Sequence, residues 1–126
     1  MNILITGTNG YIGTSFAGYL KKYNEGYRTQ FISLRDNKWK NYNLSGIDVI
    51  LHAAAVVHRP DLKGPEADKL YHSVNVDLTE ELAERAVAAG VPHFIFMSTM
   101  NVYGRSSGTI SPSDVPAPET LYGKTK

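Results

Sequence analysis

The sequence predicts an α/β fold built on a doubly wound, mostly parallel sheet. Two observations carry this prediction. Short apolar runs of strand length alternate with longer segments whose apolar residues recur every three or four positions, which is typical of one helix face. The first apolar run is joined to the first helical segment by a glycine-rich turn, Gly7 to Gly13. Because parallel strands need crossover connections, the order β-α-β-β-α-β indicates this fold class.

Length and composition narrow the classes of function. The chain has 126 residues, which suits one domain, and a formal net charge of +1, which argues against nucleic acid as a main partner. It contains no cysteine, so disulfides and thiolate metal sites are excluded. No metal site is expected, because the histidines lack ligand spacing and are interpreted as structural or solvated: His52, His58, His72 and His93. We expect a cytoplasmic protein, since the first strand follows Met1 directly and no apolar run is long enough to span a membrane.

The first strand and helix enclose a candidate phosphate site. Ile3–Ile5 is a short apolar run, and Tyr11–Tyr23 is amphipathic. Between them, Gly7 supplies the backbone freedom for a sharp turn, Gly10 allows a pyrophosphate to approach the backbone, and Gly13 allows close packing of helix on strand. Free N–H groups at the helix N-terminus favour an anion there. The spacing is G-x-x-G-x-x-G, so the flanking strand and helix favour a nucleotide site over an ordinary turn.

The second strand is predicted over Gln30–Leu34, after a turn that contains Asn24 and Gly26. Residues 38–46 are predicted to form an irregular connection or a stunted strand. A third strand, Ile47–His52, runs into Ala53, Ala54 and Ala55. Small residues at a strand's carboxyl end let a flat ligand lie against the backbone, although good packing alone would also explain alanines.

A long helical segment is predicted over Glu66–Gly90, with a break near His72 or Ser73 compatible with the pattern. Gly90 has the place of a C-terminal cap. Asn75 lies one position from the apolar stripe. Its side chain could orient a ligand, and a solvated or capping role fits at least as well.

The fourth strand is predicted over His93–Ser98 and delivers Thr99 at its carboxyl end. Residues 104–118 are rich in Gly, Ser and Pro, which is typical of a loop. A further helix is predicted to begin at Glu119 and to continue to Lys126.

Three side chains near the end of the chain suggest acid–base chemistry. Tyr122 and Lys126 are four residues apart, so on a helix they share one face. An ammonium group beside a phenol lowers the phenol's pKa, which suits proton exchange with a substrate hydroxyl. The Thr99 hydroxyl could position the same substrate oxygen. Each pattern also arises by chance, so only their joint occurrence carries the interpretation.

Together these segments resemble the extended short-chain dehydrogenase/reductase family, in its NAD-dependent epimerase/dehydratase branch. The matching segments occur in family order at residues 6–13, 48–55, 75–79, 96–104 and 122–126. The resemblance implies a Rossmann-type NAD(P)-binding fold. It also implies that residues 1–126 are one partial domain that lacks further strands and a substrate domain.

The resemblance also implies roles for individual residues. Tyr122 would be the catalytic acid/base, Lys126 would lower its pKa and bind the nicotinamide ribose, and Thr99 would hold the reacting oxygen. Six further residues and an alanine run would contact the cofactor: Gly7, Gly10, Tyr11, Ile12, Gly13, Arg35 and Ala53, Ala54, Ala55. The implied function is 4-epimerase or 4-ketoreductase chemistry on a nucleoside-diphosphate sugar, in a homodimeric protein. The alternative is an inactive dinucleotide-sensing or scaffold member of the same fold.

Some positions depart from the family pattern. Arg35 stands where users of NAD carry an acid, which favours NADP slightly, since Asp36 follows at once. Met100 and Asn101 replace an acidic pair that dehydratases need, so dehydration is not expected. The family's third strand is short or absent. Family members also continue well beyond the lysine, so we expect an N-terminal piece that is inactive or nearly so, with a fraying end and the fourth strand at a sheet edge.

Overall fold

The computed structural model describes residues 1–23 and 26–126. Asn24, in the predicted turn, lies outside the described residues. The chain divides into two compact units, which are described separately below. Unit 1 comprises residues 1–55 and 78–97, and unit 2 comprises residues 56–77 and 98–126.

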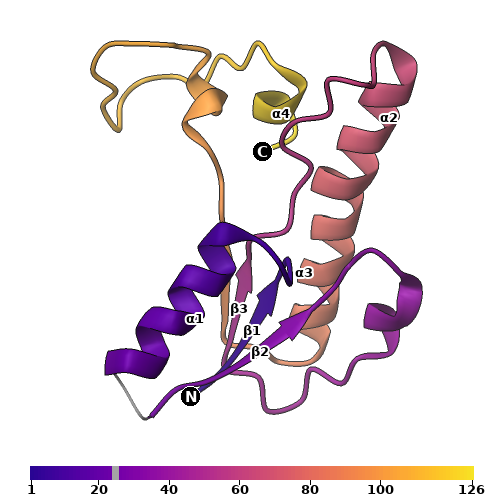
Figure 1. Ribbon diagram of the computed structural model, residues 1–126, viewed down its shortest axis with the longest axis vertical. Coiled ribbons are helices and arrows are strands. Elements are labelled where there is room, and N and C mark those ends of the chain that lie inside the picture. Colours follow the sequence, from indigo (N-terminus) through magenta and orange to yellow (C-terminus); the bar gives the residue numbers. More distant parts are fainter. Residues whose placement is uncertain (24–25) are drawn as a thin grey trace. The chain divides into compact units, whose positions relative to one another are not determined.

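Unit 1 is organised around a four-stranded sheet of order β2-β1-β3-β4 (Figure 1). The strands are β1 (Asn2–Thr6), β2 (Arg28–Ile32), β3 (Val49–His52) and β4 (His93–Phe96), and all three pairings are parallel. The chain moves outward from β1 to β2 and then returns to place β3 on the other side of β1. This reversal confirms the doubly wound fold. Ligands of such sheets bind at the carboxyl ends of the strands where the order reverses, which here is between β1 and β3.

Helices cover both faces of this sheet (Figure 1). Because successive side chains of a strand point to opposite faces, the strand residues divide into two cores. The core beneath α1 (Tyr11–Tyr23) contains Ile3, Ile5, Leu20, Val49 and Leu51. The core beneath α3 (Leu78–Ala88) contains Leu4, Ile50, Leu82 and Ala86, together with Trp39 from the 3₁₀ helix η1 (Asn37–Asn41).

The second strand lies two residues earlier than predicted. β2 pairs with β1 from Asn2↔Arg28 to Thr6↔Ile32. Beyond Thr6 the chain turns away at Gly7, so no partner residue remains for the positions after Ile32. Leu34 is nevertheless buried, in the core beneath α3, which explains why its apolar character was mistaken for a strand position.

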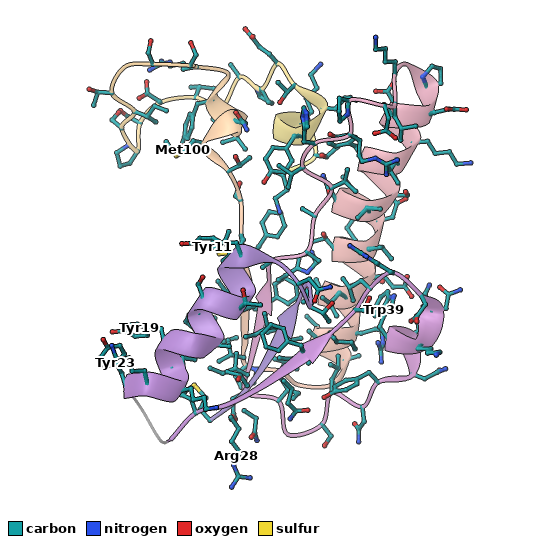
Figure 2. All side chains as sticks on the ribbon, in the orientation of Figure 1. Tyr11, Tyr19, Tyr23, Arg28, Trp39 and Met100 are labelled. Carbon is teal, nitrogen blue, oxygen red and sulfur yellow. The ribbon has the colours of Figure 1, made fainter. Side chains whose placement is uncertain are left out.

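The segment after β2 forms η1, and between residues 33 and 48, all of them described, there is no strand. The stunted-strand alternative is therefore wrong. The reason is visible at Trp39, whose side chain is buried beside α3 (Figure 2). The Arg85 guanidinium lies 5.5 Å from the centroid of that indole and donates to the carbonyls of Trp39 (2.7 Å) and Tyr42 (2.8 Å). These contacts hold the segment on the helix instead of in the sheet.

The long predicted helix is divided at the expected place. α2 (Pro65–His72) is followed by a π-helical turn, η2 (Ser73–Asp77), and then by α3. The break at Ser73 is thus confirmed. Gly90 has a φ of +70°, and the Val91 N–H reaches back to the Ala86 carbonyl at 2.9 Å, so the predicted C-terminal cap is confirmed as well.

Unit 2 contains α2, η2, the 3₁₀ helix η3 (Met100–Tyr103) and the short helix α4 (Leu121–Lys124). The predicted loop lies between η3 and α4, and its base is closed by a hydrogen bond from the Ala117 N–H to the Val102 carbonyl at 2.9 Å. Gly104, with a φ of +63°, fits so tightly at this closure that an added Cβ would lie 2.1 Å from the Ala117 oxygen. The two helical segments are thereby held together at the base of the loop.

Candidate functional site

Two glycines of the turn in unit 1 are required by the packing of the protein itself, and one is not. Gly7 has a φ of +88°, and a Cβ there would lie 3.3 Å from the Ala54 backbone. A Cβ at Gly13 would lie 2.8 Å from the Ile5 side chain. Gly10 is exposed, and its Cβ would meet only the Gly7 oxygen, at 3.4 Å. The missing side chain of Gly10 therefore serves no internal contact and leaves room above the turn.

That open turn leads into the N-terminus of α1. The Thr14 N–H donates to the Gly10 oxygen at 3.1 Å and starts the helical ladder, so the N–H groups of the preceding turn have no acceptor within the helix. The first turn carries no acidic side chain, and both Tyr11 and Ile12 are exposed. Figure 2 shows Tyr11 at this first turn. The partial positive charge of the helix end is thus available to an anion such as a phosphate.

The alanine run forms the other side of the turn. Ala53, Ala54 and Ala55 follow β3 and are partly buried. The Thr6 hydroxyl accepts hydrogen bonds from the N–H groups of Ala53 (3.1 Å) and Ala54 (3.0 Å), which fixes this backbone beside Gly7. The carboxyl ends of β1 and β3 therefore present two closely packed backbone segments without bulky side chains, a shape that fits a dinucleotide.

Arg35 and Asp36 form an exposed bend after β2. The last strand residue is Ile32, so Arg35 lies three positions beyond the strand and not at its end. The Asp36 carboxylate caps η1 by accepting the Lys38 N–H at 3.1 Å. This cap gives Asp36 a local structural role that the sequence pattern alone did not reveal.

Unit 2 brings together the segments that carry Thr99 and Tyr122. Thr99 caps η3, its Oγ1 accepting the Asn101 N–H at 3.2 Å. Thr120 caps α4 in the same way through the Gly123 N–H, at 3.0 Å. A Cβ at Gly123 would lie 2.5 Å from the Asn101 oxygen, so α4 packs directly on η3. Glycine next to Tyr122 is therefore what allows this close approach.

The predicted helix from Glu119 to Lys126 is wrong in extent. α4 ends at Lys124, with Thr125 as its cap, and Lys126 lies beyond it, so the argument from a shared helix face does not apply. The Leu121 carbonyl accepts both the Thr125 N–H, at 3.0 Å, and the Thr125 hydroxyl, at 2.8 Å. Lys126 is half-buried, and this burial lowers the pKa of its ammonium group. Its carbonyl accepts the Ser98 hydroxyl at 3.2 Å, which places its backbone beside the segment leading to Thr99.

Asn75 is more deeply built into unit 2 than a solvated residue, so the solvated interpretation is wrong. Its side chain is buried in the π-helical turn η2. Oδ1 accepts the Val56 N–H at 2.7 Å, while Nδ2 donates to the Val56 carbonyl and to Thr125 Oγ1, each at 3.0 Å. Asn75 thus links the segment after the alanine run to the cap of α4. A polar residue at a break in an apolar helix was the available signal.

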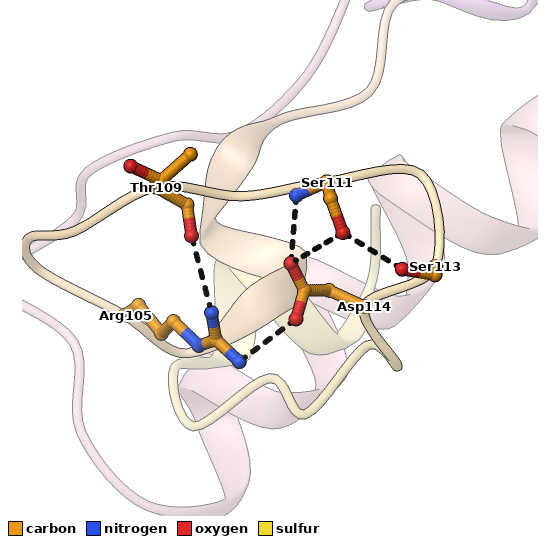
Figure 3. Close-up of polar contacts among 5 residues, drawn as sticks. All are labelled: Arg105, Thr109, Ser111, Ser113 and Asp114. Atoms are coloured by element: carbon orange, nitrogen blue, oxygen red, sulfur yellow. Dashed lines mark hydrogen bonds and ion pairs between the residues drawn. The ribbon is translucent and has the colours of Figure 1, made fainter.

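The loop between η3 and α4 is clasped by an ion pair (Figure 3). Arg105 donates to Asp114 Oδ1 at 3.1 Å and to the Thr109 carbonyl at 3.4 Å. The other carboxylate oxygen of Asp114 accepts the Ser111 N–H at 2.7 Å. The Ser111 N–H and, to a smaller extent, the Arg105 charge lower the pKa of the Asp114 carboxyl group. The sequence offered no signal for this pairing beyond loop composition.

Acid is expected to open this clasp. Since the pKa of Asp114 is lower in the folded loop, its carboxylate stabilises the fold above the ordinary aspartate pKa, and this contribution disappears as the pH falls through the folded value. In an NMR titration, the Ser111 amide resonance should therefore shift with a midpoint below that of an aspartate in an unfolded peptide. The Asp114→Asn variant should lose this titration. A midpoint at or above the ordinary value would contradict the clasp.

Comparison with known proteins identifies the family. Residues 3–126, nearly the whole chain, match the NAD dependent epimerase/dehydratase family. The chain belongs to this family. As a member of the epimerase/dehydratase family, it is 30% identical to UDP-glucose 4-epimerase of Vibrio cholerae, with 99% of this chain aligned to 44% of that protein. It is also 29% identical to methionine adenosyltransferase 2 subunit beta of Pongo abelii, over 98% of this chain and 40% of that protein. The chain thus spans less than half the length of these relatives.

Solved epimerase structures have the same fold. UDP-glucuronic acid 4-epimerase from Bacillus cereus in complex with NAD superimposes with a TM-score of 0.82 at 27% identity, covering 99% of this chain and 48% of that one. The same enzyme in complex with UDP-glucuronic acid and NAD gives a TM-score of 0.81 at 29% identity. This structural neighbour therefore binds NAD. In the described part of this family member, no helix has the length and apolar character to cross a membrane, and no three side chains are grouped as metal ligands.

Proposed function

We propose that this protein binds NAD or NADP at the glycine turn of unit 1 and takes part in 4-epimerase or 4-ketoreductase chemistry on a nucleoside-diphosphate sugar. The observation that carries the proposal is the open position at Gly10, next to the first turn of α1 and at the reversal of strand order. Family membership supports the same cofactor class. The names of its relatives support a UDP-sugar as the substrate.

The residues of unit 2 supply the proton chemistry in this proposal. A bound nicotinamide would supply hydride transfer to and from the sugar carbon. Tyr122 removes the proton from the sugar hydroxyl as its carbon is oxidised, and donates a proton on reduction. The Thr99 hydroxyl accepts the Asn101 N–H and so retains its own proton to donate to the reacting oxygen. Lys126 is proposed to bind the nicotinamide ribose, as the family resemblance implies. Dehydration is not proposed, because Met100 and Asn101 provide no acid or base.

This chain covers less than half of each relative, and this limits what we propose for the chain itself. The 126 residues align with 44% of the Vibrio cholerae epimerase. We therefore propose dinucleotide binding for these residues alone. Turnover of the nucleotide sugar, and the homodimer, are proposed for a protein that also carries the remainder found in the relatives.

Titration with the two dinucleotides tests the cofactor proposal. Arg35 is exposed beyond the carboxyl end of β2, where a guanidinium group could pair with the 2′-phosphate of NADP. We expect calorimetry to give tighter binding of NADP than of NAD. The Arg35→Ala variant should weaken NADP binding by about tenfold and leave NAD binding unchanged. Arg28→Ala is the matched control, because Arg28 is an exposed arginine at the opposite end of the same strand (Figure 2).

A second candidate is an inactive dinucleotide-sensing or scaffold protein. One observation favours it: a relative with 29% identity over 98% of this chain is named as a subunit of methionine adenosyltransferase 2. A sensor would bind the dinucleotide yet have no need of the Tyr122 hydroxyl. Substitution of Tyr122 therefore separates the two functions.

A further inference from the structure

We propose that His52, through one specific tautomer, is a positioning residue for the backbone that cradles the dinucleotide. The inference rests on the proposed cofactor site and adds a residue outside it. His52 is the last residue of β3 and is fully buried, as is Thr6 at the end of β1. The His52 Nδ1 atom lies 2.8 Å from Thr6 Oγ1, and Nε2 lies 2.9 Å from Thr79 Oγ1 on α3.

The positions of the protons follow from counting donors and acceptors. The Thr6 oxygen accepts two N–H groups, from Ala53 and Ala54, and these occupy both of its lone pairs. Its own proton must then be donated, and His52 Nδ1 is the atom within reach. Nδ1 is consequently unprotonated, so the ring proton resides on Nε2 and is donated to Thr79. The hydrogen bonds that link Thr79, His52, Thr6 and the alanine backbone permit only this neutral tautomer.

This arrangement makes the position of the cradle, the backbone of Ala53 and Ala54 beside Gly7, depend on His52. The Thr6 hydroxyl can hold both alanine N–H groups only while its own proton points at His52. A protonated Nδ1 would bring a third donor to an oxygen that has no lone pair left, and one alanine N–H would lose its partner. Since the Ala54 backbone lies directly beneath Gly7, its displacement would change the surface that receives the dinucleotide. A backbone that is already ordered before the ligand arrives loses less conformational entropy on binding, so the ligand binds more tightly.

Packing keeps the ring in this orientation. The rings of Phe94 and Phe96 each lie with their centroids 6.0 Å from that of His52, and Phe96 is nearly parallel to it. These aromatic neighbours belong to β4 and exclude water from the imidazole. The ring is therefore held in position by β4, its tautomer is set by the Thr6 hydroxyl, and Thr79 accepts the remaining ring proton.

The tautomer can be measured directly. Nitrogen-15 NMR of the histidine side chains should show His52 with a protonated Nε2 and an unprotonated Nδ1 at neutral pH, in the protein without ligand. The exposed His93 serves as an internal reference. A protonated Nδ1 at His52, in either the neutral or the charged ring, would overturn the inference whatever the cofactor proves to be.

A double-mutant cycle tests the link to cofactor binding. We expect the His52→Phe and Thr79→Val variants each to raise the dinucleotide Kd, by about tenfold for His52→Phe. Because Thr79 acts through His52, Thr79→Val should have no further effect in the His52→Phe background. Additive effects in the double variant would overturn the inference. Wild-type affinity in a folded Thr79→Val variant would also overturn it, and this second measurement remains decisive if His52→Phe does not fold. If wild type binds neither NAD nor NADP, the proposed function fails, and the positioning role fails with it, while the tautomer result stands separately.

Discussion

Replacement of Tyr122 with phenylalanine, in a protein that also carries the remainder found in the relatives, is expected to lower turnover of the nucleotide sugar by about 10² to 10⁴-fold, the usual contribution of a general acid–base group. The substitution removes only the hydroxyl that exchanges the proton, while the ring still packs within unit 2. Dinucleotide affinity should therefore stay within about twofold of wild type. Steady-state kinetics with UDP-sugars, together with calorimetry of NAD and NADP, would measure both quantities.

The control for this prediction is Tyr103→Phe. Tyr103 is a partly buried tyrosine of η3 in the same unit, and no proton-transfer role is assigned to it. Its substitution should leave turnover unchanged. Full activity in Tyr122→Phe would contradict the assignment of the acid–base group. If the longer wild-type protein binds the dinucleotide without any turnover, the sensing or scaffold function is favoured.

Gly104→Ala is expected to destabilise the protein by about 3 kcal/mol or more. Two terms add up: left-handed backbone costs an alanine about 1–2 kcal/mol, and forcing a methyl group into a filled space costs about 1–3 kcal/mol. Gly104 meets both conditions, since its φ is +63° and an added Cβ would lie 2.1 Å from the Ala117 oxygen. Urea denaturation of the variant and wild type gives the difference in the free energy of unfolding.

Gly108→Ala provides the matched control in the same loop. Its φ is also positive, +101°, but no atom lies within 4 Å of the added Cβ. It should therefore show only the backbone term, and the difference between the two variants isolates the steric contact at Ala117. Equal destabilisation by the two substitutions would contradict the tight closure between η3 and α4.

The parts of the fold that were predicted correctly depend on local signals. The strand–glycine–helix unit at the amino end was predicted well because its apolar periods and turn chemistry lie within adjacent residues; α1 occupies Tyr11–Tyr23 as expected. β2 was displaced because its end is set by the length of β1, a distant partner. The segment around Trp39 was predicted to be irregular because Arg85, which holds it in place, is far away in sequence.

The candidate site divides in the same way. The roles of Gly7 and Gly13 in packing were predictable, since a turn and a helix crossing require them. The start of α4 was not, because Thr120 caps it and Gly123 packs on Asn101 of η3, a separate element. The pairing of Asn75 with Val56 and the burial of His52 depend on contacts between separate elements. Such contacts leave no periodic trace in the sequence.

The most direct test of the cofactor site is the dinucleotide affinity of Gly10→Ala. Its added methyl group meets only the Gly7 oxygen, at 3.4 Å, so the free energy of unfolding should change by less than about 1 kcal/mol. Gly18→Ala is the control, because Gly18 lies on the same helix with no atom within 4 Å of its Cβ position. We predict that calorimetry will show at least about tenfold weaker binding of NAD or NADP to Gly10→Ala and unchanged binding to Gly18→Ala. Wild-type affinity in a fully folded Gly10→Ala variant would contradict the placement of the pyrophosphate at this turn.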